Sequence, residues 1–164
     1  MALLSDIARR RKIRYFLDGV PGDASILEIG SGSGWVGDYL RQNGWTGYVG
    51  LDVVPPADIV GDVRDWQQLG LPPSSFDVIV AFEVVEHVDC WHACHALLKP
   101  GGRMLVTTPL PHRDWVLKML ESRRLNQRRT SPHDHLVYLH EVRNFRQRQV
   151  QVVAGLSQWG VFTK

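Results

Sequence analysis

A glycine-rich turn directly after a short apolar run is the part of this sequence best suited to chemistry. The stretch from Ile26 to Gly37 reads ILEIGSGSGWVG, with glycine at positions 30, 32 and 34. Glycine lacks a Cβ atom, so the backbone can turn sharply here and approach a bound ligand closely. A helix expected to begin near Trp35 would direct its free N–H groups and its positive dipole end toward a negatively charged or strongly accepting group. Because tight turns also use glycine for steric reasons alone, the surrounding residues decide what is bound.

Two acidic residues flank this turn. Glu28 lies two residues before Gly30, inside the expected strand, where a loop built for a pyrophosphate would not favour a carboxylate. Asp52 closes the next apolar run, 20 residues after Gly32, where a βαβ unit places an acid that accepts hydrogen bonds from both ribose hydroxyls. The pattern therefore indicates a ligand that carries a ribose and a positive charge but no phosphate.

These residues belong to a longer pattern that resembles the class I S-adenosylmethionine-dependent methyltransferases, especially the small-molecule methyltransferases of quinone biosynthesis. Four segments match in order and spacing between Ile26 and Pro109: LEIGSGSG, VGLDV, GDVRDW, and FDVIVAFEVVEHV followed by LLKPGGRMLVTTP. Four segments in register are far more specific than one glycine motif. The resemblance implies S-adenosylmethionine as the cofactor and methyl transfer to an unidentified acceptor as the activity.

The resemblance also extends the predicted cofactor site. It places Asp62 and Val63 beside the adenine, with the Asp62 carboxylate accepting from the exocyclic amine, and the backbone of residues 81–83 beside the methionine part. Asp62 could also cap the short turn that contains Arg64, and the two roles are compatible. The predicted cofactor-binding set is Glu28, Gly30, Ser31, Gly32, Gly34, Asp52, Val53, Asp62, Val63, Ala81, Phe82 and Glu83.

His87 is the candidate catalytic residue. It follows the apolar run 76–82, and ligands bind at the carboxyl ends of parallel strands. Its ordinary pKa, about 6.5, suits a general base at neutral pH, although a histidine at a helix start can be purely structural. Histidine and cysteine between positions 87 and 95 also raise the possibility of zinc, but four ligands within one helix have poor geometry. No metal site is therefore predicted, and Cys90 and Cys94 are expected on successive turns of one helix.

The predicted reaction is an in-line displacement in which the acceptor atom attacks the sulfonium methyl group. Holding the two reactants in line can supply about 7 to 11 kcal/mol, and a base is needed only where the acceptor must lose a proton. A nicotinamide dehydrogenase would share the glycine turn and Asp52, but Glu28 argues against it, and Trp35 stands where the GxGxxG pattern requires glycine. A non-catalytic cofactor-binding module, or a subunit of a larger assembly, is the second alternative.

Apolar runs alternate with helical segments, which predicts an α/β fold: a Rossmann-like, doubly wound, mostly parallel sheet. The first strand is expected to begin at residue 26. Four further strands are expected over 48–52, 59–60, 76–82 and 103–108. Helices are expected over 5–17 and 35–43, with a third that carries Cys90, Cys94, Leu97 and Leu98. This arrangement would bring the glycine turn, Asp52 and the residues after 82 to one edge of the sheet.

The resemblance weakens after Pro109. A helical stripe over 115–124 and a polar, basic segment over 126–134 are expected to lie over the cleft as a lid that chooses the substrate. A helix over 141–154 and a strand over 156–163 would end the chain, so the sheet is predicted to lack the family's last strand. The strand at 103–108 would then take residues 160–163 as a direct neighbour or keep an open apolar edge, and an open edge predicts self-association or a partner subunit.

Length and composition favour one domain. The 164 residues divide into a flanking helix (1–24), a cofactor-binding core (25–109), and a lid or substrate segment with the C-terminal helix and strand (110–164). No apolar run reaches the roughly 18 residues of a membrane helix. The N-terminus also lacks a secretory signal. These observations predict a soluble, cytoplasmic protein without a membrane span.

Charge divides the chain unevenly. Residues 1–102 hold 8 Lys and Arg against 13 Asp and Glu, whereas residues 103–164 hold 11 against 4. The basic part predicts an anionic acceptor, or a nucleic acid received by Arg123, Arg124, Arg128 and Arg129. A solvated basic helix face is the alternative.

Overall fold

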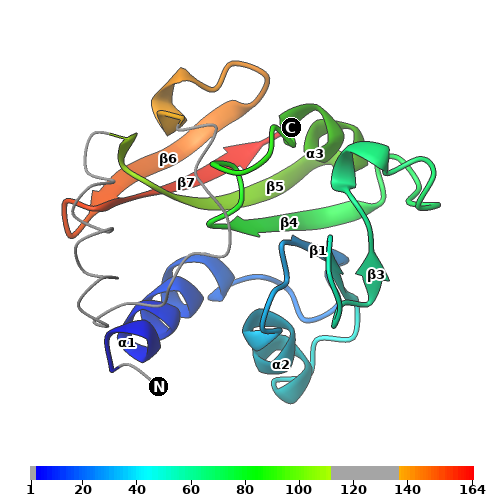
Figure 1. Cartoon of the computed structure of the whole chain (residues 1–164), viewed down its shortest axis with the longest axis horizontal. Helices are drawn as coiled ribbons and strands as arrows, with labels where there is room; N and C mark the ends of the chain where they lie inside the picture. Colours follow the sequence, from blue (N-terminus) through cyan, green and yellow to red (C-terminus); the bar gives the residue numbers. More distant parts are fainter. Residues whose placement is uncertain (1–2, 112–136) are drawn as a thin grey trace.

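The computed structural model describes residues 3–111 and 137–164. Its centre is a seven-stranded sheet with strand order β3-β2-β1-β4-β5-β7-β6 (Figure 1). The five strands from β3 to β5 are parallel, and β7 and β6 are each antiparallel to their neighbour. The strands are β1 Ile26–Ile29, β2 Tyr48–Asp52, β3 Ile59–Val60, β4 Phe76–Phe82, β5 Leu98–Pro109, β6 Arg146–Val153 and β7 Ser157–Thr163. The predicted α/β fold class is confirmed.

Helices cover both faces of this sheet, with α1 and α2 on one face and α3 on the other (Figure 1). The helices are α1 Leu3–Lys12, a π-helical turn η1 Ile13–Leu17, α2 Trp35–Gln42 and α3 Trp91–Leu97, with short 3-10 turns η2 Val63–Asp65 and η4 Leu139–Glu141. Along β4, Ile79 and Ala81 join the core beneath α3, whereas Val78 and Val80 join the core beneath α2. Burial on both faces explains why β4 is a nearly continuous apolar run.

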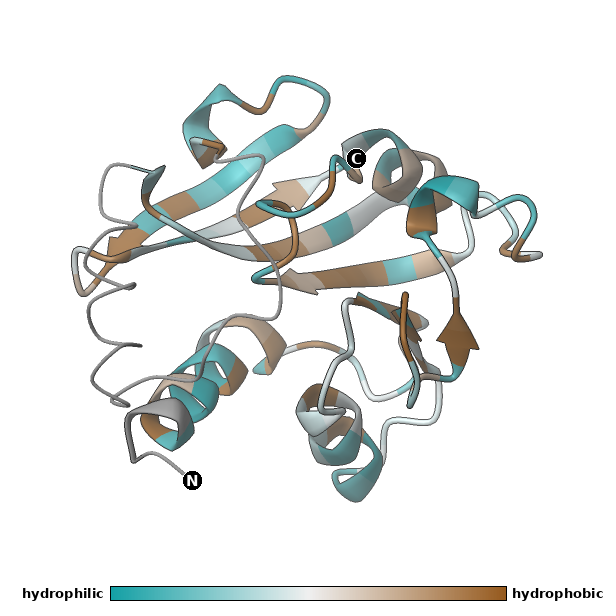
Figure 2. Cartoon of the chain, viewed as in Figure 1, coloured by the Kyte–Doolittle hydropathy of each residue, from teal (hydrophilic) through white to brown (hydrophobic). Residues whose placement is uncertain are grey.

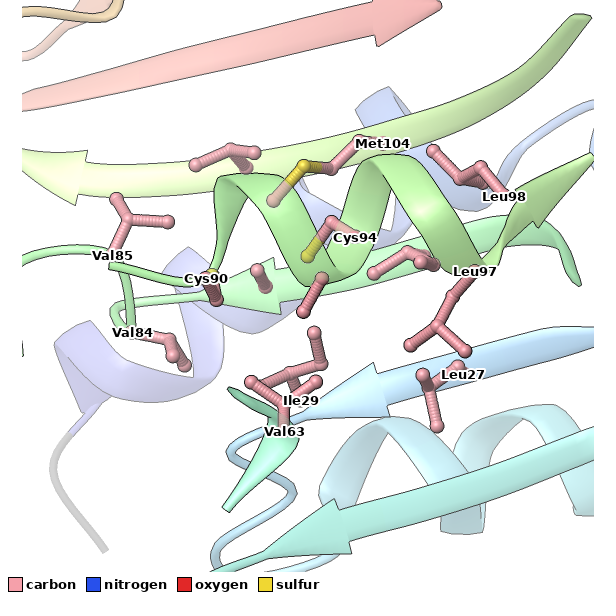
Figure 3. Close-up of a cluster of buried hydrophobic side chains, with 14 of the residues drawn as sticks. Leu27, Ile29, Val63, Val84, Val85, Cys90, Cys94, Leu97, Leu98 and Met104 are labelled. Carbon is pink, nitrogen blue, oxygen red and sulfur yellow. The ribbon is translucent and has the colours of Figure 1, made fainter. Parts of the chain in front are cut away.

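The core beneath α3 contains the two cysteines. Cys90, just before α3, and Cys94 and Leu97 within it are fully buried, and Figure 3 shows all three among the buried side chains of this core. Both cysteines are free thiols. Within the part of the chain that the structure describes, no group of three or more His, Cys, Asp or Glu residues is arranged to hold a metal ion. The cysteines are therefore core residues in this structure.

The N-terminal helix changes pitch before it reaches the sheet. The α-helix ends at Lys12, and the π-helical turn that follows buries Phe16 and Leu17. The ring of Phe16 lies 5.1 Å from that of Phe82 and 5.3 Å from that of Trp159, centroid to centroid. These aromatic contacts attach the N-terminal segment to β4 and β7, so the last turn of α1 lies next to the carboxyl end of β4.

The C-terminal prediction is wrong in one respect, because residues 146–153 form strand β6 where a helix over 141–154 was expected. The predicted last strand is β7, which pairs with β5 from Arg103 opposite Thr163 to Pro109 opposite Ser157. The expected neighbour of strand five is thus confirmed, whereas the lack of a last strand and the open apolar edge are contradicted. Residues 146–153 form a strand because they pair with β7. Helix propensity reflects only local sequence, so it does not report such tertiary pairing.

The outer edge of the sheet is polar. The first part of β6 is hydrophilic (Figure 2), and residues 146–149, with sequence RQRQ, are exposed. The opposite edge strand, β3, is only two residues long. Short or charged edge strands resist pairing with other chains.

Among the described residues, no helix has the length and apolar character needed to cross a bilayer.

Candidate active site

The glycine turn lies between the end of β1 and the start of α2, as predicted. Gly30, Gly32 and Gly34 all have positive φ angles, of +71°, +48° and +73°. A Cβ atom on Gly30 would also lie 2.5 Å from Cγ2 of Val84, the residue two positions after β4. Glycine is thus required here by backbone conformation and by close packing. The turn and the end of β4 form adjoining walls of one site.

Asp52 joins this turn from the neighbouring strand. The N–H of Gly32 donates to Asp52 Oδ2 at 2.8 Å, and the N–H of Val54 donates to Oδ1 at 3.2 Å. Glu28 and Gly50 are register partners in β1 and β2, so the two strands end side by side. The predicted meeting of Asp52 with the glycine turn is confirmed. Val53 follows Asp52, with 65% of its surface exposed.

Glu28 is buried beneath the turn, only 3% exposed. Its Oε2 accepts a short hydrogen bond from the hydroxyl of Tyr48. Burial, together with the negative charge of Asp52, raises the pKa of Glu28 to about 8, although the Tyr48 bond and Arg41 act in the opposite direction. The carboxyl group is therefore largely protonated at neutral pH, and it would become a carboxylate beside a bound cation.

Ser31 in the turn packs closely against Gly50 in β2. Ser31 is buried, and its Oγ has no hydrogen-bond partner among the described residues. A Cβ atom on Gly50 would lie 2.8 Å from the Tyr48 hydroxyl and 3.1 Å from Cβ of Ser31. A buried hydroxyl without a partner is uncommon in folded proteins and suggests a group that binds there.

Asp62 and Val63 follow β3 on the same side of the sheet. The Asp62 carboxylate accepts the N–H of Arg64 at 2.9 Å and caps the short turn Val63–Asp65. Its pairing with the Arg64 side chain lowers the pKa of Asp62. Val63 is buried in the core beneath α3 (Figure 3). The capping role expected for Asp62 is confirmed, and contact with adenine stays a prediction for both residues.

The end of β4 provides the remaining predicted positions. Ala81 and Phe82 are buried, whereas Glu83 is exposed and has a φ angle of +57°. Left-handed backbone is costly for a residue with a side chain, so surrounding contacts must hold Glu83 in place. Its N–H donates to the carbonyl of Thr107 in β5 at 2.8 Å, and the Thr107 hydroxyl donates to its Oε1 at 2.7 Å.

Lys12 reaches the same position from the N-terminal helix. Its Nζ donates to Glu83 Oε1 at 2.8 Å and to Thr107 Oγ1 at 2.9 Å. It also lies 5.2 Å from the ring centroid of Phe82. No motif in the sequence linked Lys12 to Glu83 or Thr107, which lie 71 and 95 residues further along the chain.

Glu86 and His87 lie in the turn after β4. Glu86 is 1% exposed and accepts from the Thr108 hydroxyl at 3.0 Å. Burial, with the nearby charge of Glu83, raises the pKa of Glu86 to about 8. His87 is half-buried, and its backbone N–H donates to the carbonyl of Val84 at 2.8 Å. The structure thus brings the candidate base to the same edge of the sheet as the glycine turn.

The lid predicted over 115–134 lies outside the described residues, as do Arg123, Arg124, Arg128 and Arg129. A hollow lined in part by Ser25, Asp77 and Lys99 lies at the amino ends of the strands, away from the glycine turn. Ligands of parallel α/β sheets bind at the carboxyl ends, so this hollow is separate from the candidate site.

Comparison with known proteins agrees with this geometry. A family model described as a methyltransferase domain matches residues 5–150. A probable S-adenosylmethionine-dependent methyltransferase of Mycolicibacterium smegmatis is 33% identical over 124 residues, 62% of this chain and 46% of that protein. A ubiquinone biosynthesis O-methyltransferase of Pseudomonas aeruginosa is 30% identical over 101 residues, 51% of this chain and 43% of that protein. The chain thus spans about half the length of the curated relatives it matches.

Solved structures share the fold. An S-adenosylmethionine-dependent methyltransferase from Archaeoglobus fulgidus superposes with a TM-score of 0.65 at 14% identity, over 97% of this chain and 94% of that one. One from Mesorhizobium loti gives a TM-score of 0.62 at 17% identity, over 90% and 95%. The family model covers most of the chain, and the predicted resemblance is confirmed. The chain belongs to the methyltransferase-domain family, within the class I S-adenosylmethionine-dependent methyltransferases.

Proposed function

We propose that this chain binds S-adenosylmethionine at the glycine turn and transfers its methyl group to an acceptor. The observation that carries the proposal is the contact of Asp52 with Gly32 at 2.8 Å, because it holds a carboxylate beside a turn that a nucleoside can approach closely. The buried Ser31 hydroxyl, which has no hydrogen-bond partner among the described residues, supports the fit. The proposed contact residues are Glu28, Gly30, Ser31, Gly32, Gly34, Asp52, Val53, Asp62, Val63, Ala81, Phe82 and Glu83.

Each part of the site has a task in this proposal. Asp52 accepts hydrogen bonds from ribose hydroxyls, and Glu28, once deprotonated, offers a negative charge to a cationic ligand. The cofactor supplies an activated methyl group when bound. The chain's own contribution is to hold the ligand and the acceptor in line, an effect that can supply about 7 to 11 kcal/mol. The site therefore needs no nucleophile of its own.

We propose a hydroxyl group as the acceptor, with His87 as the general base that removes its proton. The support is twofold: several matched relatives carry O-methyltransferase in their names, and His87 is half-buried in the turn that follows β4. An anionic acceptor or RNA, suggested by the basic second half of the chain, is the alternative. A cofactor-binding module without activity is the competing function.

Transfer of a labelled methyl group tests the proposal. The chain should methylate at least one member of a panel of small phenolic, quinol-like, lipid, glycan and RNA acceptors, and the product of the preferred class should carry the label on oxygen. Cofactor binding without transfer to any acceptor would favour the inactive module. Label on nitrogen or carbon would reject the hydroxyl acceptor and the role of His87, while leaving the transferase activity in place.

A further inference from the structure

Lys12 is placed unusually for a residue in a basic helix. It ends α1 beside the exposed Arg11, yet its side chain is only 13% exposed. A carboxylate oxygen of Glu83 and the hydroxyl oxygen of Thr107 lie within hydrogen-bond distance of its Nζ, and the centroid of the Phe82 ring lies 5.2 Å away. A charged group loses hydration when it is buried, so these contacts must compensate. Lys12 is therefore part of the site wall and not of the solvated helix face.

The residue that Lys12 contacts is strained and adjoins the glycine turn. Glu83 has left-handed backbone at the point where β4 ends. Its next neighbour, Val84, comes so close to Gly30 that a Cβ atom there would lie 2.5 Å from Val84 Cγ2. Strained residues persist when surrounding contacts hold them and often occur at functional sites. The conformation of Glu83 thus sets the position of the wall that faces the glycine turn.

We infer that Lys12 is a cofactor-positioning residue: through Glu83 and Thr107 it fixes the turn after β4 and holds the N-terminal helix against the cofactor site. This inference rests on the proposed function. Arg9 lies 5.6 Å from the ring centroid of Trp35, the first residue of α2, and provides a second contact between the helix and the site. The N-terminal segment is then part of the cofactor site, beyond its packing on the sheet.

Binding of S-adenosylhomocysteine, measured by calorimetry, tests the inference. Lys12→Met keeps the length of the side chain but removes the charge-assisted bonds, and it should weaken binding about tenfold. Lys12→Arg keeps the cation and should restore most of the affinity. Arg11→Met, one residue away on the exposed face, is the matched control and should bind as the wild type does.

A second variant shows whether Lys12 acts through Glu83. Glu83→Gln should weaken binding to a similar extent, and adding Lys12→Met to it should cause little further loss, because both changes break one pair. In the ligand-free protein, Lys12→Met should also speed hydrogen exchange at the Glu83 amide. If the Lys12 variant does not fold, the Glu83 variant and its exchange rate still test the pair.

Two results separate the possible failures. Wild-type affinity in a folded Lys12→Met protein, or fully additive losses in the double variant, would overturn the inference alone. A wild-type chain that binds neither S-adenosylmethionine nor S-adenosylhomocysteine would overturn the proposed function together with the inference.

Discussion

At the scale of single residues, two buried carboxyl groups make the stability of this chain depend on pH. Glu28 and Glu86 are 3% and 1% exposed, and both have a pKa raised to about 8. An unfolded chain would release these protons near pH 4.3. Between the two values the folded state binds more protons, so the free energy of unfolding falls as pH rises from about 5 to about 8.

Glu28→Gln should reduce the fall in the free energy of unfolding with pH, because the amide keeps an acceptor for the Tyr48 hydroxyl but does not titrate. The free energy of unfolding of the variant, relative to that of the wild type, should therefore be higher at pH 8 than at pH 5, by on the order of 1 kcal/mol or more. Urea unfolding at several pH values measures it. Glu141→Gln, at an exposed position, is the control, and parallel pH curves for wild type and Glu28→Gln would contradict the assignment.

The glycine turn gives a second prediction at this scale. Gly30→Ala places a Cβ atom 2.5 Å from Val84 at a φ of +71°, whereas Gly34→Ala meets a similar φ of +73° in open space. Left-handed backbone alone costs about 1 to 2 kcal/mol. The close contact should add about 1 to 3 kcal/mol at Gly30, so unfolding experiments should rank Gly30→Ala as clearly the less stable variant. Equal losses would show that Val84 moves freely.

The site was predictable where spacing encodes it. Asp52 follows Gly32 by 20 residues, a separation that the βαβ unit fixes, so sequence reasoning brought the two together correctly. Lys12 and Glu83 are 71 residues apart, and their contact depends on a π-helical turn and on packing of Phe16 against Phe82. No local pattern records such a contact, which is why the pair was not predicted. The partnership of Tyr48 with Glu28 was missed for a similar reason, although both lie on adjacent strands whose pairing was expected.

At the scale of elements, the prediction failed at β6. Its sequence, RQRQVQVV, has residues with good helix propensity and few apolar side chains to mark alternation. The strand exists because β7 pairs with it from Ser157 to Thr163. The buried strand β4 was predicted to the residue, because its apolar run reflects burial on two faces. An exposed edge strand leaves no such record.

The buried side chain of Gln158 in β7 connects this strand to the end of β5 and to η4. It is 2% exposed; its Oε1 accepts the N–H of Leu139 at 3.0 Å, and its Nε2 donates to the carbonyls of Pro109 and Val137. Gln158→Leu leaves these buried backbone groups without partners and should cost about 2 to 4 kcal/mol in thermal or urea unfolding. Gln149→Leu, on the exposed part of β6, should change stability by less than about 0.5 kcal/mol. Equal effects would mean that η4 is not fastened to β7 by this side chain.

At the scale of the whole molecule, the completed sheet changes the expectation for assembly. Self-association was predicted from an open apolar edge at strand five, but β7 and β6 cover that edge. On this side of the sheet the edge strand is β6, which carries Arg146 and Arg148, both exposed. Charged side chains on an edge strand oppose pairing with a second chain.

Replacing these two arginines should therefore expose the edge to pairing. Arg146→Val with Arg148→Val should increase association with protein concentration, measured by light scattering, while Arg143→Val, just before the strand, should not. Unchanged scattering in the double variant would show that the bulge between Gln147 and Gln149, and not charge, protects the edge.

Cofactor binding is proposed at the site formed by Asp52 and the glycine turn, and calorimetric titration of S-adenosylmethionine measures it. The wild-type chain should bind, Asp52→Ala should weaken binding by about 1.5 to 3 kcal/mol through loss of charge-assisted bonds, and Asp23→Ala, an exposed acid before the amino end of β1, should bind like the wild type. Unchanged affinity in a folded Asp52→Ala variant, or no binding by the wild type, would show that Asp52 and the glycine turn do not form the cofactor site.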